Sequence, residues 1–540
     1  MGGKLYFFFV ATFLTLVLHA CQMQNTQEKQ VFRYNESKGI STLDPAYARS
    51  QTIIWPVHQI FDGLVQFDSL LNIQPALAKS WKISDDGLTY TFHLRTDVKF
   101  HNHELFDNDD ERIVKAGDFV YSFNRIMNPK ISSPGTWIFS DLDKSFGQNG
   151  CKAINDSTFQ VKIKRPFPPF LGMLGMKYCA VVPQKVVEHY GNAFGQNPVG
   201  TGPFKLQQWK QGEAILLRRN KSYYQKDSLG NTLPYLESVV ISFITDKQSE
   251  FMEFMLGNLD FISGINAQYK DALLTRGGQL RKKHKDKIYL QTGPYLNTEY
   301  LGFNLDSTTS QVVPLAVRKA INYCFDRKEL VTYLRNNMAF PANKGMVPPA
   351  LTSRYPSKIQ GYNYKPNRAR DLLAHAGYDD GYPERINLLT TSDYIDICEY
   401  IQHKSAQIGI DIEIELGTGA SFRNKISKGK AQMFRGSWIA DYPDPENYLA
   451  LFYSKNKSPQ GPNYTRFENN EVDNLYIQSL KTNSKNKRDS SYYLIENRVL
   501  KKSPVVPLYY DKVVRFVQID VKGFAANPFN LLELKYVKKK

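Results

Sequence analysis

The sequence predicts a mixed α/β protein, because stretches with strand patterns alternate with stretches of helical spacing along most of its 540 residues. Hydrophobic residues make up 42% of the chain, enough to bury sizeable cores, and the length indicates two to four domains. Gly and Pro clusters at 200–203 and 348–349 mark turns between these stretches.

Strands are predicted where β-branched and aromatic residues form short runs, and helices where apolar residues recur at intervals of three and four. The predicted strands are 31–34, 88–94, 181–182, 214–217, 239–243 and 410–414. The predicted helices are 114–127, 247–256, 314–335 and 394–407.

The amino terminus has the pattern of a lipoprotein signal peptide. A short positive start precedes an apolar run at 5–18, and Ala20 stands directly before Cys21. The run is shorter than the roughly 20 residues of a membrane-spanning helix. We expect residues 1–20 to be removed, Cys21 to carry lipid, and residues 21–30 to form the anchor and a polar tether in the cell envelope, on the periplasmic side.

Charge and cysteine content narrow the possible functions. The formal net charge is +17, but the basic residues are scattered and accompany no nucleic-acid motif, so solvated faces are expected and nucleic acid is not. Four further cysteines, Cys151, Cys179, Cys324 and Cys398, are too widely spaced for a Cys-x-x-Cys site. The sequence is compatible both with a Cys151–Cys179 disulfide and with buried free thiols.

The segment 435–449 is predicted to form a short loop with several charged and aromatic side chains. It contains Arg435, Trp438, Asp441, Tyr442 and two prolines. Proline fixes φ and pushes the preceding residue to extended geometry, so neighbouring side chains are held in defined directions. A carboxylate such as Asp441 can accept hydrogen bonds from an ammonium group, and Arg435 can bind a carboxylate. The segment is therefore either a loop that binds a zwitterion or an ordinary turn with ion pairs.

This segment resembles the Trp-x-Ala-Asp-Tyr-x-x-Pro motif of the oligopeptide and dipeptide substrate-binding proteins of ABC importers, the extracellular solute-binding protein family 5. Other fragments similar to the family follow in the family's order between about residues 30 and 515. They are Leu43-Asp44-Pro45, Ile60-Phe61-Asp62-Gly63-Leu64, 75–81, 86–95, 98–100, 200–204, 317–327, 368–378 and 506–509. Asp44 is expected to form a turn.

The resemblance implies a two-lobed periplasmic-binding-protein fold, type II-like and of cluster C, with an extra domain inserted in the first lobe. The first lobe is expected at 31–66, 195–292 and 508–540, the inserted domain at 67–194, and the second lobe at 293–507. Hinges are expected near 295–301 and 504–509, where a few residues absorb the closing motion. The chain is expected to be a monomer.

The resemblance also implies a receptor that captures peptides between its lobes and delivers them to a membrane permease. The peptide main chain is expected to bind like an added strand. Asp441 matches the family aspartate and is expected to bind the ligand's α-ammonium. Arg435 is expected to meet the carboxylate of a short peptide or to form an ion pair within the lobe. Trp438, Tyr442 and Asn304 are expected to line the cleft, although Trp438 and Asn304 equally suit buried positions.

Two alternatives stay open. Within the same fold, the ligand can be nickel, an oligosaccharide, an opine or haem, because a fold does not fix a ligand. From another class, His101, His103 and Glu104 suggest a metal-dependent peptide-hydrolysing lipoprotein, but they lack the spacing of a His-Glu-x-x-His helix. The sequence contains no nucleophile elbow and no phosphate-binding glycine loop, so we expect no catalytic residue, cofactor or resident metal.

Overall fold

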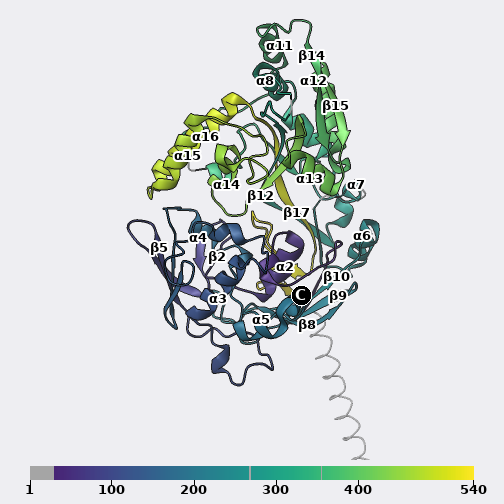
Figure 1. Cartoon of the computed structure of the whole chain (residues 1–540). Coiled ribbons are helices and arrows are strands. Elements are labelled where there is room, and N and C mark those ends of the chain that lie inside the picture. Colours follow the sequence, from purple (N-terminus) through teal and green to yellow (C-terminus); the bar gives the residue numbers. More distant parts are fainter. Residues whose placement is uncertain (1–29, 265, 267–268, 310, 354) are drawn as a thin grey trace, which may run out of the picture.

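The computed structural model describes residues 30–540 except 265, 267–268, 310 and 354. The predicted signal peptide and Cys21 lie outside these residues. Within the described part, no helix has the length and apolar character needed to cross a membrane. Figure 1 shows two lobes joined by the long strands β12 (Ile288–Phe303) and β17 (Val505–Gln518).

One mixed sheet runs through both lobes in the order β15-β14-β16-β12-β17-β11-β1-β10-β9-β8, with β13 beside β17. Its first-lobe strands are β1 (Val31–Asn35), β8 (Phe204–Lys210), β9 (Ala214–Arg219), β10 (Ser238–Ser242) and β11 (Phe261–Ser263). Its second-lobe strands are β13 (Ala339–Pro341), β14 (Tyr382–Thr390), β15 (Ile410–Leu416) and β16 (Met433–Ile439). The two lobes are therefore joined by backbone hydrogen bonds as well as by chain crossings.

The pairing of β12 with β17 is antiparallel and irregular between the lobes. The register shifts between Pro294 and Thr298 and again between Glu299 and Tyr300. Extra residues on one strand bend and twist it locally. The irregular stretch lies where the chain passes from one lobe to the other.

A separate sheet in the order β4-β5-β7-β6 forms the outer part of the first-lobe half. Its strands are β4 (Ala78–Ile83), β5 (Thr89–Leu94), β6 (Cys151–Asn155) and β7 (Thr158–Lys162). Two small sheets of two strands each are also present. One pairs β2 (Val65–Phe67) with β3 (Ile73–Pro75), and the other pairs β18 (Val521–Lys522) with β19 (Lys538–Lys539). The helix α3 (Ala116–Met127) packs on β6 and β7. Phe119 and Phe123 on its apolar face contact the ring of Phe159.

The remaining helices cover the sheets. On the first-lobe side they are α2 (Gln51–Ile60), α4 (Phe170–Met173), α5 (Gln184–Tyr190), α6 (Lys247–Leu256) and α7 (Lys270–Leu273). On the second-lobe side they are α8 (Leu315–Tyr323), α9 (Arg327–Leu334), α10 (Pro349–Thr352), α11 (Pro366–Ala374), α12 (Ile395–Ala406), α13 (Gly419–Ser427), α14 (Glu446–Leu449), α15 (Asn470–Lys481) and α16 (Lys485–Lys502).

Two sequence predictions are wrong. The helix predicted at 314–335 is two helices, because Asp326 lies in extended geometry and its carboxylate accepts a hydrogen bond from the Lys328 amide, which caps α9. The strand predicted at 181–182 is an extended connection. Val181 donates to the carbonyl of Asp62 and Val182 to the hydroxyl of Ser122, so no strand ladder forms. The other predicted elements lie close to their predicted bounds.

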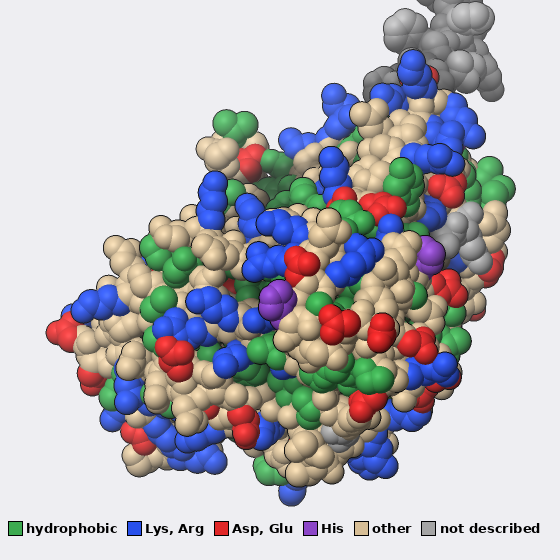
Figure 2. Space-filling model, turned by 90° about the horizontal axis from the view of Figure 1, so that it is seen from above, with side chains coloured by type: hydrophobic (Ala, Val, Ile, Leu, Met, Phe, Trp, Pro, Cys, Tyr) green, Lys and Arg blue, Asp and Glu red, His purple; other side chains and the backbone are tan. Residues whose placement is uncertain are grey.

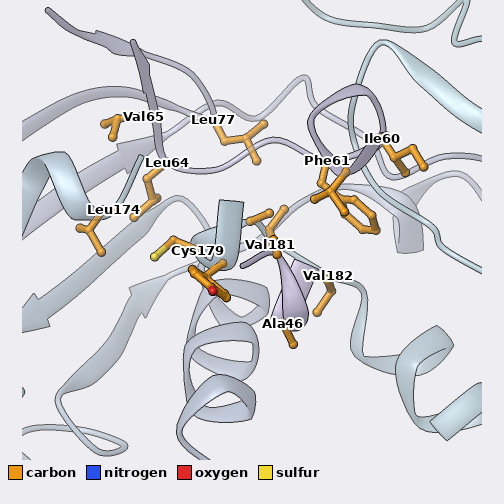
Figure 3. Packing of buried hydrophobic residues seen from close by; sticks show 14 of the residues in the cluster. Ala46, Ile60, Phe61, Leu64, Val65, Leu77, Leu174, Cys179, Val181 and Val182 are labelled. Carbon is orange, nitrogen blue, oxygen red and sulfur yellow. The ribbon is translucent and has the colours of Figure 1, made fainter. Parts of the chain in front are cut away.

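Both valines of that connection point into the first-lobe core. Figure 3 shows Val181, Val182 and Cys179 among side chains such as Phe61 and Leu64. The cysteines at 151, 179, 324 and 398 are buried free thiols. Lys and Arg side chains are spread over the face in Figure 2 with Asp and Glu among them, as expected for solvated faces.

Candidate functional site

The loop that follows β16 is held against the irregular stretch of β12. In the β16–β12 ladder, Trp438 lies opposite Thr298. Beyond the ladder, the Ala440 amide and the Tyr448 hydroxyl both donate to the carbonyl of Leu296, at 2.9 and 2.8 Å. The loop that begins at Ala440 is thus fixed at both ends by one backbone carbonyl.

Asn447, which the sequence analysis did not single out, organises the inside of this loop. The residue is 4% exposed, and its side-chain carbonyl oxygen accepts hydrogen bonds from the Trp438 indole at 2.9 Å and the Asp441 amide at 3.3 Å. The signal in the sequence was an asparagine three residues after Asp444, since asparagine side chains often bond to nearby backbone groups at the start of a helix. In the structure the Asn447 backbone amide donates to the carbonyl of Asp444.

Asp441 is an exposed carboxylate that faces a cleft and has no ion pair within the described part of the chain. The surrounding lobes desolvate it, which raises its pKa to about 6, and a hydrogen bond from Asn447 opposes this rise. A partly desolvated carboxylate without a cation suits a positively charged ligand group.

The cleft has a volume of about 780 Å³ and lies between the lobes. The second lobe contributes Asp441 and its neighbours, and the first lobe contributes the start of α2 and the turn around Tyr178. Near the loop the lobes are close, since a Cβ on Gly172 of α4 would lie 3.7 Å from the ring of Pro443. A volume of this size is typical of sites for small molecules.

Arg435 is engaged inside the protein. Its guanidinium donates to Glu299 at 2.6 Å and lies 3.3 Å from the ring centroid of Tyr394. The side chain of Arg435 is 12% exposed and that of Glu299 2% exposed. Asn297 links Glu299 to Asp511, whose pKa is raised to about 6 by burial and by the charge of Glu299. Of the two roles expected for Arg435, the structure displays the ion pair.

The other predicted site residues also bond to protein groups. Trp438 is half-buried and donates to Asn447. Tyr442 is buried and donates to Glu446, and its ring lies 6.3 Å from that of Trp137 across the lobes. Asn304 is 1% exposed and donates to the carbonyl of Gly429 at 2.8 Å.

The histidines of the alternative metal site make structural hydrogen bonds. The His101 Nδ1 accepts from the Gly200 amide, so Nε2 carries the proton and donates to the carbonyl of Gly202 at 3.0 Å. Burial lowers the pKa of His101 to about 4 and keeps the ring neutral. His103 bonds to the Tyr190 hydroxyl at 3.2 Å. Residues 30–540, with the gaps given above, contain no cluster of three His, Cys, Asp or Glu side chains placed to hold a metal.

A ligand-sized cleft between two lobes, above strands that cross from one lobe to the other, defines the class of two-lobed binding proteins. The chain belongs to the bacterial extracellular solute-binding proteins of family 5, since the model of that family's middle region matches residues 72–460. Both the resemblance and the two-lobed α/β fold expected from the sequence are confirmed.

Several proteins that are named for a ligand, or solved with one, are similar to this chain. The chain is 29% identical to heme-binding protein A of Haemophilus influenzae, with 95% of each chain covered. It is also 29% identical to glutathione-binding protein GsiB of Salmonella paratyphi A, with 90% of each covered. The ABC transporter-associated periplasmic binding protein DppA of Helicobacter pylori, solved with the peptide STSA, matches with a TM-score of 0.76 at 25% identity and covers 95% of this chain and 99% of its own.

Proposed function

We propose that this chain is the substrate-binding component of an ABC importer, which captures short peptides in the interlobe cleft and delivers them to a permease. The observation that carries the proposal is Asp441, an exposed carboxylate on the cleft wall whose pKa is raised to about 6 by desolvation and which has no cation among the described residues. The α-ammonium of a peptide supplies that cation. Family membership and the peptide complex of DppA support the same ligand class.

The ligand contacts predicted for Arg435, Trp438, Tyr442 and Asn304 stay predictions. Their polar groups bond to protein partners in the structure. We propose that Arg435, Trp438 and Tyr442 mainly shape and stiffen the wall that carries Asp441, whereas Asn304 ties the end of β12 to the carbonyl of Gly429. The peptide main chain would lie along this wall as an added strand, which gives affinity without dependence on side chains.

Calorimetric titration with paired ligands tests the proposal. Asp441→Asn keeps the shape and removes the charge, so it should weaken binding of a free-amine tripeptide by about thirtyfold or more, in line with about 2–5 kcal/mol for a broken buried charge pair. Binding of the N-acetylated tripeptide should change little. Asp379→Asn, on an exposed turn, is the matched control. Equal losses for both ligands, or a wild type that prefers the acetylated one, would remove Asp441 from ammonium binding.

A non-peptide solute is the second candidate, favoured by the relative that is named a heme-binding protein. Haem would appear in an absorbance titration of the purified chain. Native mass spectrometry of the protein as isolated identifies a co-purifying ligand of either kind. A haem-loaded protein that ignores peptides would replace the first proposal.

We propose the remaining features in line with the family's extracellular setting. Cys21 carries lipid that anchors the chain to the membrane on the periplasmic side. The protein binds its ligand as a monomer and does not convert it chemically. The domains lie at 31–66, 195–292 and 508–540, at 67–194, and at 293–507. In support of the last of these, one buried cluster draws on residues from Leu301 to Val506, and it extends over the proposed boundary only to Leu508 and Tyr509. Cys21→Ala should abolish detergent-phase partitioning and leave thermal unfolding unchanged.

A further inference from the structure

Arg318 on α8 is a buried cation without a partner in the part of the chain that the structure describes. The residue is 8% exposed, and its Nε and Nη1 atoms are enclosed and donate no hydrogen bond there. It forms no ion pair with those residues either, and Nη2 is the nitrogen left outside the enclosure. A buried charge is costly unless it is paired, so this guanidinium lacks a counter-ion.

Arg327, further along the chain, is a buried arginine whose hydrogen bonds are satisfied. It is 1% exposed, and its guanidinium donates to the carbonyl of Pro507 at 2.6 Å and to the backbone and side-chain carbonyls of Asn322, both at 3.0 Å. The fold therefore supplies acceptors to one buried arginine and, among the described residues, none to the other. Burial lowers the pKa of Arg318 to about 10, so this group keeps its charge at neutral pH.

Three further cations gather near Arg318, and they are Lys319, Arg368 and Lys502. Lys319 is half-buried, and its pKa is lowered by burial first and then by the charges of the other cations. Arg368 is exposed, and its guanidinium carbon lies 4.9 Å from the centre of the Tyr323 ring on α8. No carboxylate of the described residues is among the groups that shift the pKa of Arg318 or of Lys319. Like charges held together without a counter-charge attract an anion.

Contacts between three helices fix the positions of these cations. Asn322 on α8 is fully buried, and its side-chain amide donates to the carbonyl of Arg318 at 3.3 Å and to the hydroxyl of Ser503 at 2.9 Å. Ser503 directly follows Lys502, the last residue of α16, and α11, which carries Arg368, packs against α8. None of the four cations lines the interlobe cleft, and α8 and α11 lie at the end of the second lobe that is furthest from the first lobe (Figure 1).

We propose that these four cations form a binding site for a phosphate group. Nη2 of Arg318 donates to a phosphate oxygen at the base of the site, and Lys319, Arg368 and Lys502 balance the remaining negative charge. The same group occurs free in solution and in anionic lipid headgroups. Because the central arginine is buried, a small free anion reaches it more readily than a flat membrane surface does, so the free anion is the expected ligand.

Calorimetric titration with inorganic phosphate at constant ionic strength tests the inference. The full chain carrying Cys21→Ala is used throughout, so that no lipid on the anchor contributes to binding. Arg318→Gln should weaken phosphate binding about tenfold or more, because a hydrogen bond between two charged groups is lost. Lys319→Gln should weaken it about twofold to fivefold, as for a partly exposed ion pair. Arg423→Gln, at an exposed position of α13, is the control and should change nothing.

Thermal unfolding of Arg318→Met shows whether the buried cation lacks a partner within the protein. In phosphate-free buffer this variant should unfold at the same temperature as its parent or higher, because an apolar side chain replaces an unpaired buried charge. Phosphate should raise the unfolding temperature of the parent and leave that of the variant unchanged. A marked loss of stability in phosphate-free buffer, or a variant that does not fold, would overturn the inference, since Arg318 would then be engaged inside the protein.

Vesicles separate the two sources of the phosphate group. Co-sedimentation with phosphatidylglycerol vesicles should not depend on Arg318, whereas binding of free phosphate should. The inference is overturned if free phosphate does not bind at millimolar concentration, even where Arg318-dependent binding to the vesicles makes the lipid the source. Equal weakening of phosphate binding by Arg318→Gln and Arg423→Gln would also overturn it, because the net charge of +17 would then account for the binding.

Discussion

Two aspartates in proline-containing loops near the cleft have opposite environments. Asp44, before Pro45, is 3% exposed and forms a two-bonded pair with Arg125 at 2.9 and 2.6 Å, and it also caps the Ala46 amide. Asp441, two residues before Pro443, is exposed to the cleft and has no such cation among the described residues. The residue type and the local sequence are similar. The difference teaches that a partner elsewhere in the fold decides whether a carboxylate stabilises the protein or is left for a ligand.

The largest effect is expected where the paired aspartate is broken. Asp44→Asn leaves the buried guanidinium of Arg125 without its counter-ion, so the free energy of unfolding should fall by about 3–5 kcal/mol. Urea unfolding measures this. The double variant Asp44→Asn, Arg125→Met should recover part of the loss. A loss below about 1 kcal/mol would show that the pair is not a structural determinant of this loop.

The support of the unpaired aspartate can be broken next. Asn447→Ala leaves the partly buried N–H groups of Trp438 and Asp441 without their acceptor, at a cost of about 0.5–1.5 kcal/mol in unfolding free energy. Peptide affinity should fall as well, because the carboxylate loses its fixed position. Asn447→Asp keeps the acceptor oxygen and should retain stability better than Asn447→Ala. Equal losses of stability for both variants would argue against this role of the acceptor.

The charge state of Asp441 sharpens the comparison through pH. The ligand ammonium binds the ionised carboxylate, and the pKa of this group in the free protein is about 6. Affinity should therefore fall about tenfold between pH 7 and pH 5, as protonation competes with binding. Titrations of wild type over this range should show the fall, and those of Asp441→Asn should be flat. A flat wild-type profile would contradict the assignment.

The smallest effect is expected when the unpaired charge is removed from the free protein. The fold raises the pKa of Asp441, so ionisation of this group reduces stability as pH rises through about 4 to 6. Asp441→Asn should change the unfolding free energy at pH 8 by no more than about 1 kcal/mol, in the stabilising direction, because solvent screens an exposed group. A marked destabilisation would mean that Asp441 supports the loop.

Local patterns predicted much of the fold. The helix at 247–256 was predicted with its observed bounds, since its signals lie within the segment itself. The break at Asp326 was missed because helical spacing continues across it, and one side-chain cap starts a new helix. The valines at 181 and 182 were predicted as a strand from their β-branched side chains. They are buried, but their amides donate to Asp62 and Ser122 and not to a neighbouring strand.

The residues of the candidate site were likewise predicted only in part from the sequence. Asp441 was nominated from a contiguous motif, and it lies on the cleft wall. Its role as ligand partner stays a prediction. Glu299, the partner of Arg435, is 136 residues distant in sequence, and Leu296, which holds the Asp441 loop, lies on another strand. Such contacts depend on tertiary packing that periodicity and composition do not specify.

The backbone of Leu296 connects the Asp441 loop with the stretch of β12 that lies between the lobes. Its carbonyl holds both ends of the Asp441 loop, its amide donates to the carbonyl of Pro528 in the C-terminal segment, and it lies in the irregular stretch of β12 between the lobes. The loop and the irregular interlobe stretch of β12 therefore share the carbonyl of Leu296. We expect a displacement of the loop to act directly on this stretch, so that occupancy of the cleft would change the relative orientation of the lobes without an intervening element.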